Sequence, residues 1–159
     1  MSGFGPWIAK TFEELSAREV YEILRARAIV FVKEQGINCV DPDTVDYSAI
    51  HIFAMKDEGI YAYLRAYRVD DETVKVGRIL AVPHRQGIGT ELMKFAIKEI
   101  IHRTGCKRIV MDAQKYAVKF YENLGFVVTS DDYYEEGVLH VDMCLDTGKA
   151  DIPVGENKE

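Results

Sequence analysis

The chain has 159 residues, of which 48% are hydrophobic and 29% are charged, and its formal net charge is −6. This composition is ordinary for a soluble globular protein, and the length suits one domain with a hydrophobic core. The negative charge and the lack of a basic stripe exclude broad nucleic-acid binding, because nothing would neutralise the phosphates.

Targeting and metal-binding signals are also missing from the sequence. No apolar run approaches the length of a membrane span, and the N-terminal residues lack the basic and apolar regions of a signal peptide. The three cysteines, Cys39, Cys106 and Cys144, lie far apart and form no C-x-x-C motif. This spacing argues against a zinc site or a disulfide framework and favours a reducing compartment. We therefore expect a cytoplasmic protein with no membrane partner and no metal.

A short strand and a helical region are predicted first. Trp7–Lys10 is the strand, and Ser16 with Glu19 three residues later is a capping-box pattern that marks a helix start. Apolar residues then recur at helical spacing, at Val20, Ile23, Leu24, Ala28 and Phe31. A break near Val30 would divide this run into two helices.

An acidic loop is predicted over Cys39–Ala49, which contains Pro42. We interpret its carboxylates, Asp41, Asp43 and Asp46, as solvated. Binding of a cation or attraction of a cationic amine is the alternative, but a metal site would need more converging oxygen ligands than the sequence places there.

Three strands follow, and polar turns separate them. They span Ile50–Met55, Ile60–Val69 and Val74–Val82. We expect these strands to form an antiparallel meander.

The rest of the chain alternates helices with strands. A helix over Glu91–Arg103 carries an apolar face and ends at Gly105. The remaining elements are a strand, a helix closed by Gly125 and two strands, over Arg108–Asp112, Tyr116–Leu124, Phe126–Val128 and Val138–Leu145. This order indicates one α/β domain with a mixed sheet over residues 1–146 and a flexible tail over residues 147–159.

The most informative segment is His84-Arg85-Gln86-Gly87-Ile88-Gly89-Thr90, between a predicted strand and a predicted helix. Two glycines let the backbone curl, because glycine tolerates positive φ. Unpaired N–H groups at a helix start attract an anion, and Arg85 adds a positive charge. We interpret the segment as a pyrophosphate cradle, with an ordinary strand-to-helix turn as the alternative.

The crossover through the following helix makes a βαβ unit, so Val74–Val82 and Arg108–Asp112 should be parallel neighbours. Ligands in such sheets bind at the carboxyl ends of strands. The cradle follows Val82, and Gln114 follows the neighbouring strand on the same side. Tyr121 lies on the next helix, so one cleft would hold a phosphate at one end and a phenol farther in.

With these motifs the chain resembles the GNAT superfamily of acyl-CoA-dependent N-acetyltransferases, over roughly Phe12 to Leu145. The strand, turn and helix resemble the family signature, which is a strand, then [QR]-x-x-G-x-[GA], then a helix. Four further segments resemble a small bacterial subgroup: Phe31-Val32-Lys33-Glu34-Gln35; Asp43, Asp46 and His51; Ala113-Gln114 with Phe120-Tyr121 and Gly125-Phe126; and Gly137-Val138-Leu139-His140-Val141-Asp142-Met143. The resemblance implies the α/β GNAT fold, a mixed and mostly antiparallel sheet flanked by helices.

The cradle departs from the family signature at one point. Two residues usually separate the basic residue from the first glycine, whereas Gln86 alone separates Arg85 from Gly87. Strict spacing places His84 at the basic position, so the phosphate contact falls to His84 or Arg85.

The resemblance further implies acetyl-CoA as the donor and direct transfer to an amine of a small molecule or a peptide. Backbone groups of Leu80, Ala81 and Val82 would hold the pantetheine arm and polarise the thioester carbonyl. The cradle segment from His84 to Thr90 would bind the pyrophosphate, and Gln114 and Phe120 complete the expected cofactor contacts.

Tyr121 matches the family position of the general acid, with a core aromatic that packs on Phe120 and Phe126 as the alternative. Glu34 is the candidate general base, with a solvated carboxylate as the alternative. His51 and His140 are candidates for the substrate side, although a lone histidine in a strand is more often structural.

We predict an N-acetyltransferase and leave a homodimer open. One alternative is a non-catalytic CoA-binding or regulatory module on the same fold. Another is a nucleotide-binding protein, but the Lys-Ser/Thr pair of a Walker-type loop does not follow the glycines.

Overall fold

The computed structural model of the chain describes residues 3–37, 40–57, 59–82 and 87–149. The chain divides into a first compact unit, Met1–Tyr67 with Val76–Met93, and a second, Arg68–Lys75 with Lys94–Glu159. It passes from one unit to the other within three elements: β3 (Gly59–Asp70), β4 (Thr73–Ala81) and α2 (Ile88–Thr104).

The strands of the first unit follow the predicted order. β1 (Ile8–Thr11) pairs antiparallel with β2 (Ile50–Lys56), which pairs antiparallel with β3. β4 follows β3 in the strand order. Each of these strands begins and ends within one residue of its predicted bounds, because polar turns separate the apolar runs.

Helix α1 (Ala17–Arg27) begins at the predicted capping box. The Ser16 hydroxyl accepts a hydrogen bond from the Glu19 N–H at 3.0 Å, and the Glu19 carboxylate accepts one from the Ser16 N–H at 2.8 Å. This exchange satisfies two of the groups that a helix start leaves unpaired. The break expected near Val30 is a change to a π-helix, η2 (Ala28–Glu34), which continues directly from α1.

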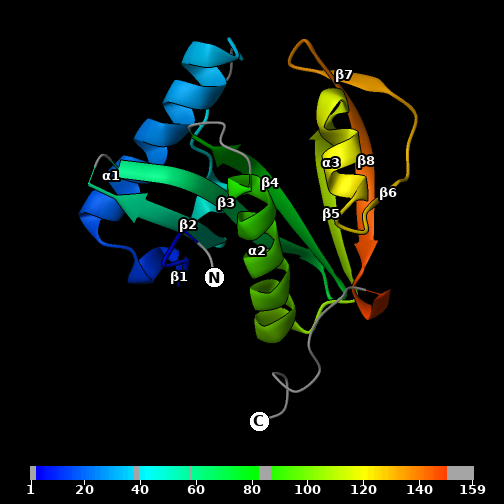
Figure 1. Cartoon of the computed structure of the whole chain (residues 1–159), viewed down its shortest axis with the longest axis horizontal. Helices are drawn as coiled ribbons and strands as arrows, with labels where there is room; N and C mark the ends of the chain where they lie inside the picture. The colour runs from blue at the N-terminus through cyan, green and yellow to red at the C-terminus, as the bar shows by residue number, and fades with distance from the viewer. Residues whose placement is uncertain (1–2, 38–39, 58, 83–86, 150–159) are drawn as a thin grey trace. The chain divides into compact units, whose positions relative to one another are not determined.

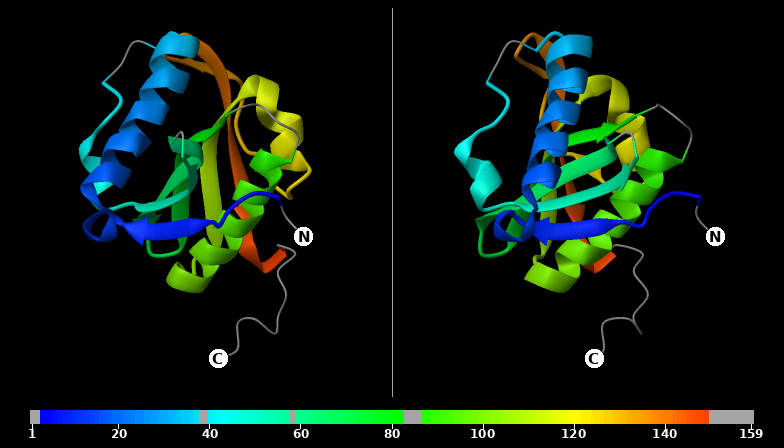
Figure 2. Two further views of the ribbon diagram at one scale, coloured as in Figure 1. Left: turned by 60° about the vertical axis from the view of Figure 1, so that its left-hand side comes forward. Right: turned by 90° about the vertical axis from the view of Figure 1, so that its left-hand side faces the viewer.

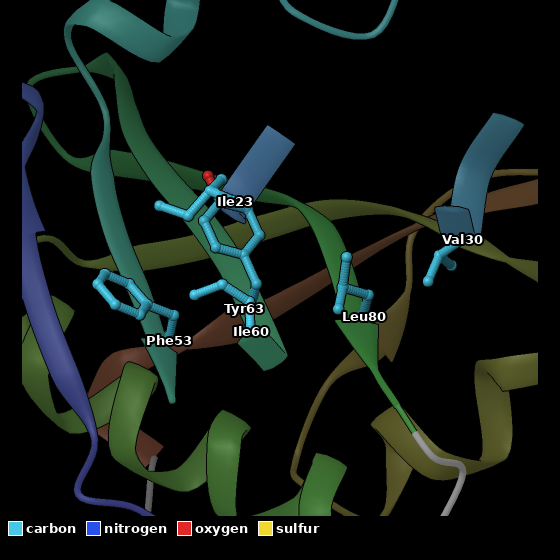
Figure 3. Close-up of a cluster of buried hydrophobic side chains, with 6 residues drawn as sticks. All are labelled: Ile23, Val30, Phe53, Ile60, Tyr63 and Leu80. Atoms are coloured by element: carbon cyan, nitrogen blue, oxygen red, sulfur yellow. The ribbon is translucent and has the colours of Figure 1, made fainter. Parts of the chain in front are cut away.

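Helix α1 lies against the strands of the first unit (Figures 1 and 2). A cluster of buried side chains joins the helical segment to β2, β3 and β4 (Figure 3): Ile23, Val30, Phe53, Ile60, Tyr63 and Leu80. Burial of an apolar side chain of this size contributes about 1.5–3 kcal/mol. Because Leu80 belongs to this cluster, the core of the unit fixes the end of β4.

A buried arginine on α1 holds the loop that follows η2. Arg27 has an exposed fraction of 0%, and its Nε and Nη1 donate to Asp41 Oδ2 and Asp46 Oδ1, each at 2.8 Å. Asp41 and Asp46 are also buried. The interpretation of the acidic loop as solvated is therefore wrong for these two carboxylates, because an arginine of the same unit neutralises them.

The second unit has the strand order β4, β5, β8, β6. The start of β4 pairs in parallel with β5 (Arg108–Gln114), which confirms the predicted βαβ crossover. β5 pairs antiparallel with β8 (Val138–Asp146) along its whole length. Two short strands, β6 (Val127–Val128) and β7 (Tyr133–Glu135), also pair antiparallel with β8. The sheet is thus mixed and mostly antiparallel, as predicted.

Two helices accompany these strands. α2 begins at Ile88, three residues before the predicted start, and the Gly105 N–H at its end donates to the Ile101 carbonyl at 2.9 Å. α3 (Val118–Glu122) follows a 3-10 turn, η4 (Lys115–Ala117), and is shorter than predicted. α3 packs beside β6 (Figure 1). The rings of Tyr121 and Phe126 meet there, with centroids 6.0 Å apart.

The residues that follow β8 are hydrogen-bonded to the segment before β5. Thr147 Oγ1 donates to the Cys106 carbonyl at 2.8 Å, and Thr147–Lys149 form a 3-10 turn, η5. The rest of the predicted tail lies outside the described residues, as does Cys39, while Cys106 and Cys144 are free thiols. Within the described ranges, the structure contains no helix that is long and apolar enough to cross a membrane.

We expect that replacement of Arg27 by alanine lowers the free energy of unfolding by about 3–5 kcal/mol, because the change removes a buried guanidinium that two buried carboxylates share. Arg18→Ala, on an exposed position of the same helix, should change it by less than about 0.5 kcal/mol. Urea unfolding of both variants measures the difference. Equal effects of the two changes would contradict a central role for the buried ion pairs.

Candidate functional site

The predicted cofactor contact on β4 lies beyond the part of the strand that pairs with β5. The parallel ladder joins Thr73, Val74 and Lys75 to β5, so Leu80 and Ala81 follow the paired segment. Val82 N–H donates to the Tyr61 carbonyl at 2.7 Å and is therefore engaged with β3. Since successive N–H groups of a strand point to opposite edges, we expect the N–H of Ala81 to point away from β3.

An irregular residue precedes this segment. Arg78 has φ of 53°, in the left-handed region that costs a residue with a side chain roughly 1–2 kcal/mol. Its Nε donates to Asp41 Oδ1 and its Nη2 to the Asp41 carbonyl, each at 2.8 Å. The acidic loop thus holds β4 through Arg78, the left-handed residue that lies two positions before Leu80.

A third arginine completes the buried ionic network. Arg65 Nη1 donates to Asp43 Oδ1 at 2.6 Å and to Asp46 Oδ1 at 2.8 Å, and its side chain is 5% exposed. Hydrogen bonds from Arg65 lower the pKa of Asp43. Burial alone would raise the pKa of Asp46, but hydrogen bonds from Arg27 and Arg65 outweigh it and lower the pKa. Both carboxylates therefore stay charged at neutral pH and serve the fold.

His51 is part of the same network. Its Nε2 lies 2.9 Å from the Asp46 carbonyl and its Nδ1 lies 2.6 Å from the Tyr63 hydroxyl. Because a carbonyl only accepts, Nε2 carries the proton and Nδ1 accepts from the tyrosine. The ring is 2% exposed, and burial lowers its pKa. Both nitrogens are engaged, so this placement favours a structural role over the substrate side.

The cradle is described in part. His84, Arg85 and Gln86 lie outside the described residues. Gly87 has φ of 99°, which residues with a side chain rarely adopt, and its carbonyl accepts from the Glu91 N–H at 3.0 Å. Ile88, Gly89 and Thr90 form the first turn of α2, where N–H groups have no partner within the helix. The described part therefore has the turn and the helix start that a pyrophosphate cradle needs.

Glu34 is the last residue of η2, and its side chain is exposed. The cavity described below, which lies in the same unit, is lined by neither Glu34 nor His51. Of these two candidate residues of the first unit, Glu34 is thus in solvent and His51 is enclosed by hydrogen bonds.

In the second unit, two predicted residues are brought together. Gln114 at the end of β5 is the ladder partner of His140 on β8. His140 Nδ1 donates to the Val138 carbonyl at 2.8 Å, and its ring stacks on Tyr133 with ring centroids 6.0 Å apart. With Nδ1 protonated, a neutral His140 keeps a lone pair on Nε2. His140 therefore has the tautomer that a general base requires.

Tyr121 is 8% exposed, and its ring packs edge-on against those of Phe120 and Phe126. The ring centroids are 5.1 Å and 6.0 Å from that of Tyr121. Burial raises its pKa. The ring thus packs as a core aromatic does, while the hydroxyl makes no hydrogen bond to any residue that the structure describes. A raised pKa increases the cost of full proton transfer to a thiolate and favours donation of a hydrogen bond.

The first unit contains a cavity of about 470 Å³ that the sequence does not predict. Its lining comes from the N-terminal segment, α1, η2, both ends of the β2–β3 hairpin turn, the end of β4 and the start of α2: Phe4, Glu22, Arg25, Ala26, Ile29, Lys56, Gly59, Ile60, Tyr61, Val82 and Ile88. The family resemblance points to the turn after Val82. It does not show which residues of α1 lie beside that turn, because their position depends on tertiary packing.

Comparisons with known proteins agree with this fold. A family model described as "Acetyltransferase (GNAT) domain" matches residues 44–147. The chain belongs to the GNAT acetyltransferase family.

The similar proteins align with this chain over nearly their whole length. A UPF0039 protein of Schizosaccharomyces pombe is 32% identical over 144 residues, which cover 88% of this chain and 96% of the relative. Protein ElaA of Escherichia coli is 30% identical over 152 residues, which cover 91% and 98%. The crystal structure of an acyl-CoA N-acyltransferase from Pseudomonas aeruginosa is 27% identical, with a TM-score of 0.83 over 89% of this chain and 99% of that chain. The predicted family and fold are confirmed, and the yeast protein shows that the relatives are not confined to bacteria.

The buried His51 predicts a pH dependence of stability. Its pKa is lowered in the folded state, so below about pH 6.5 the unfolded chain takes up a proton that the folded ring does not. The free energy of unfolding should therefore fall as the pH drops from about 8 to about 5, by up to about 1.4 kcal/mol per pH unit for this group. Urea unfolding across this range should give a shallower slope for His51→Gln. An unchanged slope would mean that His51 is not the group responsible.

Proposed function

We propose that the protein is an N-acetyltransferase that moves an acetyl group from acetyl-CoA directly to an amine of a small molecule or a peptide. The observation that carries the proposal is Gly87, in the left-handed region between the end of β4 and the first turn of α2. This arrangement directs unpaired N–H groups and the positive end of a long helix toward one anion. Membership of the GNAT family supports a CoA pyrophosphate as that anion.

The proposed reaction needs little from the protein beyond position and charge. The amine nitrogen attacks the thioester carbonyl, a C–N bond forms, the C–S bond breaks, and the amine loses a proton while CoA leaves as a thiolate. We assign polarisation of the carbonyl to the N–H of Ala81, because that of Val82 is engaged with β3. Gln114 and Phe120 are proposed to contact CoA from the second unit.

Tyr121 is proposed as the group that stabilises the departing thiolate. Its reference pKa already exceeds that of a thiol by about 1.5 units, so full transfer costs about 2 kcal/mol, and burial adds to this cost. A hydrogen bond from the phenol lowers the energy of the thiolate without that cost.

Two residues compete for the role of general base. Glu34 is the proposed base, and its exposure favours relay of the proton through water. His140 is the alternative, because its hydrogen bond to Val138 leaves Nε2 free to accept a proton. We further propose a cytoplasmic location, no nucleic-acid or membrane partner, and no bound metal.

A non-catalytic CoA-binding module is the second candidate. The short spacing between Arg85 and Gly87 favours it, because the residue that meets the phosphate would be displaced. Such a module would bind acetyl-CoA and release no thiol with any amine, so binding and turnover need separate measurements.

Acetyl-CoA is expected to stabilise the fold, because the cradle exists only in the folded state. At 100 times its dissociation constant it should add about 2.7 kcal/mol to the free energy of unfolding. Gly87→Ala should lose most of this gain. Gly105→Ala, at the other end of α2, also places a side chain at positive φ but should keep the gain. Thermal unfolding with and without acetyl-CoA tests all three proteins, and an unchanged melting temperature of the parent would disprove the cofactor.

The tyrosine role predicts a separation of binding from turnover. Tyr121→Phe should keep the affinity for acetyl-CoA, since the ring and its packing on Phe120 and Phe126 remain. The turnover number should fall by about 10²–10⁴-fold, as on loss of a positioned acid. Thiol release with a saturating amine measures it. Turnover equal to the parent's would make Tyr121 a core aromatic only.

A further inference from the structure

The cavity of the first unit has an apolar inner wall. It is formed by Ala26, Ile29, Ile60, Tyr61, Val82 and Ile88. Its volume, about 470 Å³, lies within the range of small-molecule sites, roughly 300–1,000 Å³. A body of this size is far larger than an acetyl group, so the cavity has room for a second substrate.

The cavity lies beside the turn that carries Gly87, which is part of the proposed cradle. Val82 follows β4 and Ile88 begins α2, so the two residues stand on either side of the turn that carries Gly87. Phe4, another wall residue, lies 3.7 Å from the point where a side chain on Gly87 would begin. A molecule in the cavity would therefore lie beside the end of β4, where Ala81 is proposed to hold the thioester.

The charges of the lining are few and mostly positive. Glu22 is its only carboxylate among the described residues, and its Oε1 accepts from Arg25 Nε at 3.0 Å and Nη2 at 2.8 Å. Lys56 adds a second cation, with Nζ 5.2 Å from the centroid of the Tyr61 ring. A ligand with several positive charges would meet two cations and one carboxylate that is already paired, which disfavours polyamines and basic peptides.

We propose that this cavity binds the acceptor, and that the acceptor is a small primary amine on an apolar body with no further positive charge. This inference rests on the proposed transferase function and names its substrate class. The apolar wall takes the body of the amine, and a weakly polar site favours the neutral form of the amine, which is the form that attacks the thioester.

The single tryptophan of the chain provides a readout that needs no turnover. Trp7 lies 6.5 Å from Tyr61, between ring centroids, and Tyr61 lines the cavity. Filling of the cavity should therefore change the fluorescence of Trp7. Phenethylamine and hexylamine serve as probes, with methylamine and spermidine as the small and the polycationic comparison.

Two alanines of one helical segment supply matched variants. Ala26 lines the cavity, whereas Ala28 is exposed and does not. Ala26→Phe should weaken phenethylamine binding at least tenfold and raise the KM of that amine similarly, while Ala28→Phe should change both by less than about twofold. The thermal shift by acetyl-CoA should be the same in both variants.

The possible outcomes separate this inference from the proposed function. Loss of the acetyl-CoA shift in the parent would overturn the function and the inference together. A normal shift with spermidine preferred over phenethylamine, or with Ala26→Phe equal to Ala28→Phe, would overturn the inference alone. If Ala26→Phe does not fold, Ile29→Ala replaces it; enlargement of the cavity should shift preference toward bulkier amines, and an unchanged preference would overturn the assignment.

Discussion

The guanidinium of Arg27 is withdrawn from water, and the order of the first unit depends on the two carboxylates that neutralise it. Asp41 and Asp46 come from a loop that is otherwise short of apolar anchors, so this charge fixes the loop on α1. The loop in turn holds Arg78 and thereby the bend in β4. A buried ion pair contributes little net stability, since desolvation offsets the attraction, but its geometry is strict. The network therefore acts mainly to select one path for the loop and for β4.

Each unit contains its own candidate residues. The first unit contains the end of β4, the glycine turn, the helix start and the cavity. The second supplies a buried phenol among aromatic rings and a histidine whose free nitrogen is set by a hydrogen bond to its own strand. Local contacts orient each group. The pairing of Val82 with β3 orients Ala81, and the Val138 carbonyl orients His140. The rings of Phe120 and Phe126 hold the ring of Tyr121.

Features with local causes were predictable from the sequence. The capping box at Ser16, the glycine that ends α2 and the alternation of strands with polar turns each need only a few neighbouring residues. The glycines of the family signature predicted a turn before α2, and the crossover rule gave the parallel pair of β4 and β5. The short strand β7 was missed because its three residues are largely exposed and carry no alternating pattern. The start of α2 was placed late because Ile88, Gly89 and Thr90 were assigned to the cradle segment, whereas they form the first turn of the helix and Ile88 is buried.

The buried network and the cavity could not be predicted because they join residues far apart in the chain. One signal was present: Arg27 lies four residues after Ile23 and three after Leu24, on the face predicted to be apolar. A charge in that position requires a buried partner, and the loop with three aspartates is the nearest source. The cavity has no such signal, since its wall is built from several segments that lie far apart in the chain.

Gly59 sets a constraint of a different kind. It has φ of 112°, and a side chain at this position would begin 2.6 Å from Glu22 Oε1 and 3.0 Å from Arg25 Nη2. A side chain at this turn would therefore displace the ends of the ion pair on α1. A larger residue at 59 would be strained by the positive φ and would displace the flexible ends of Glu22 and Arg25, both of which line the cavity. Drift at an apparently neutral turn would thus alter which molecules the protein accepts.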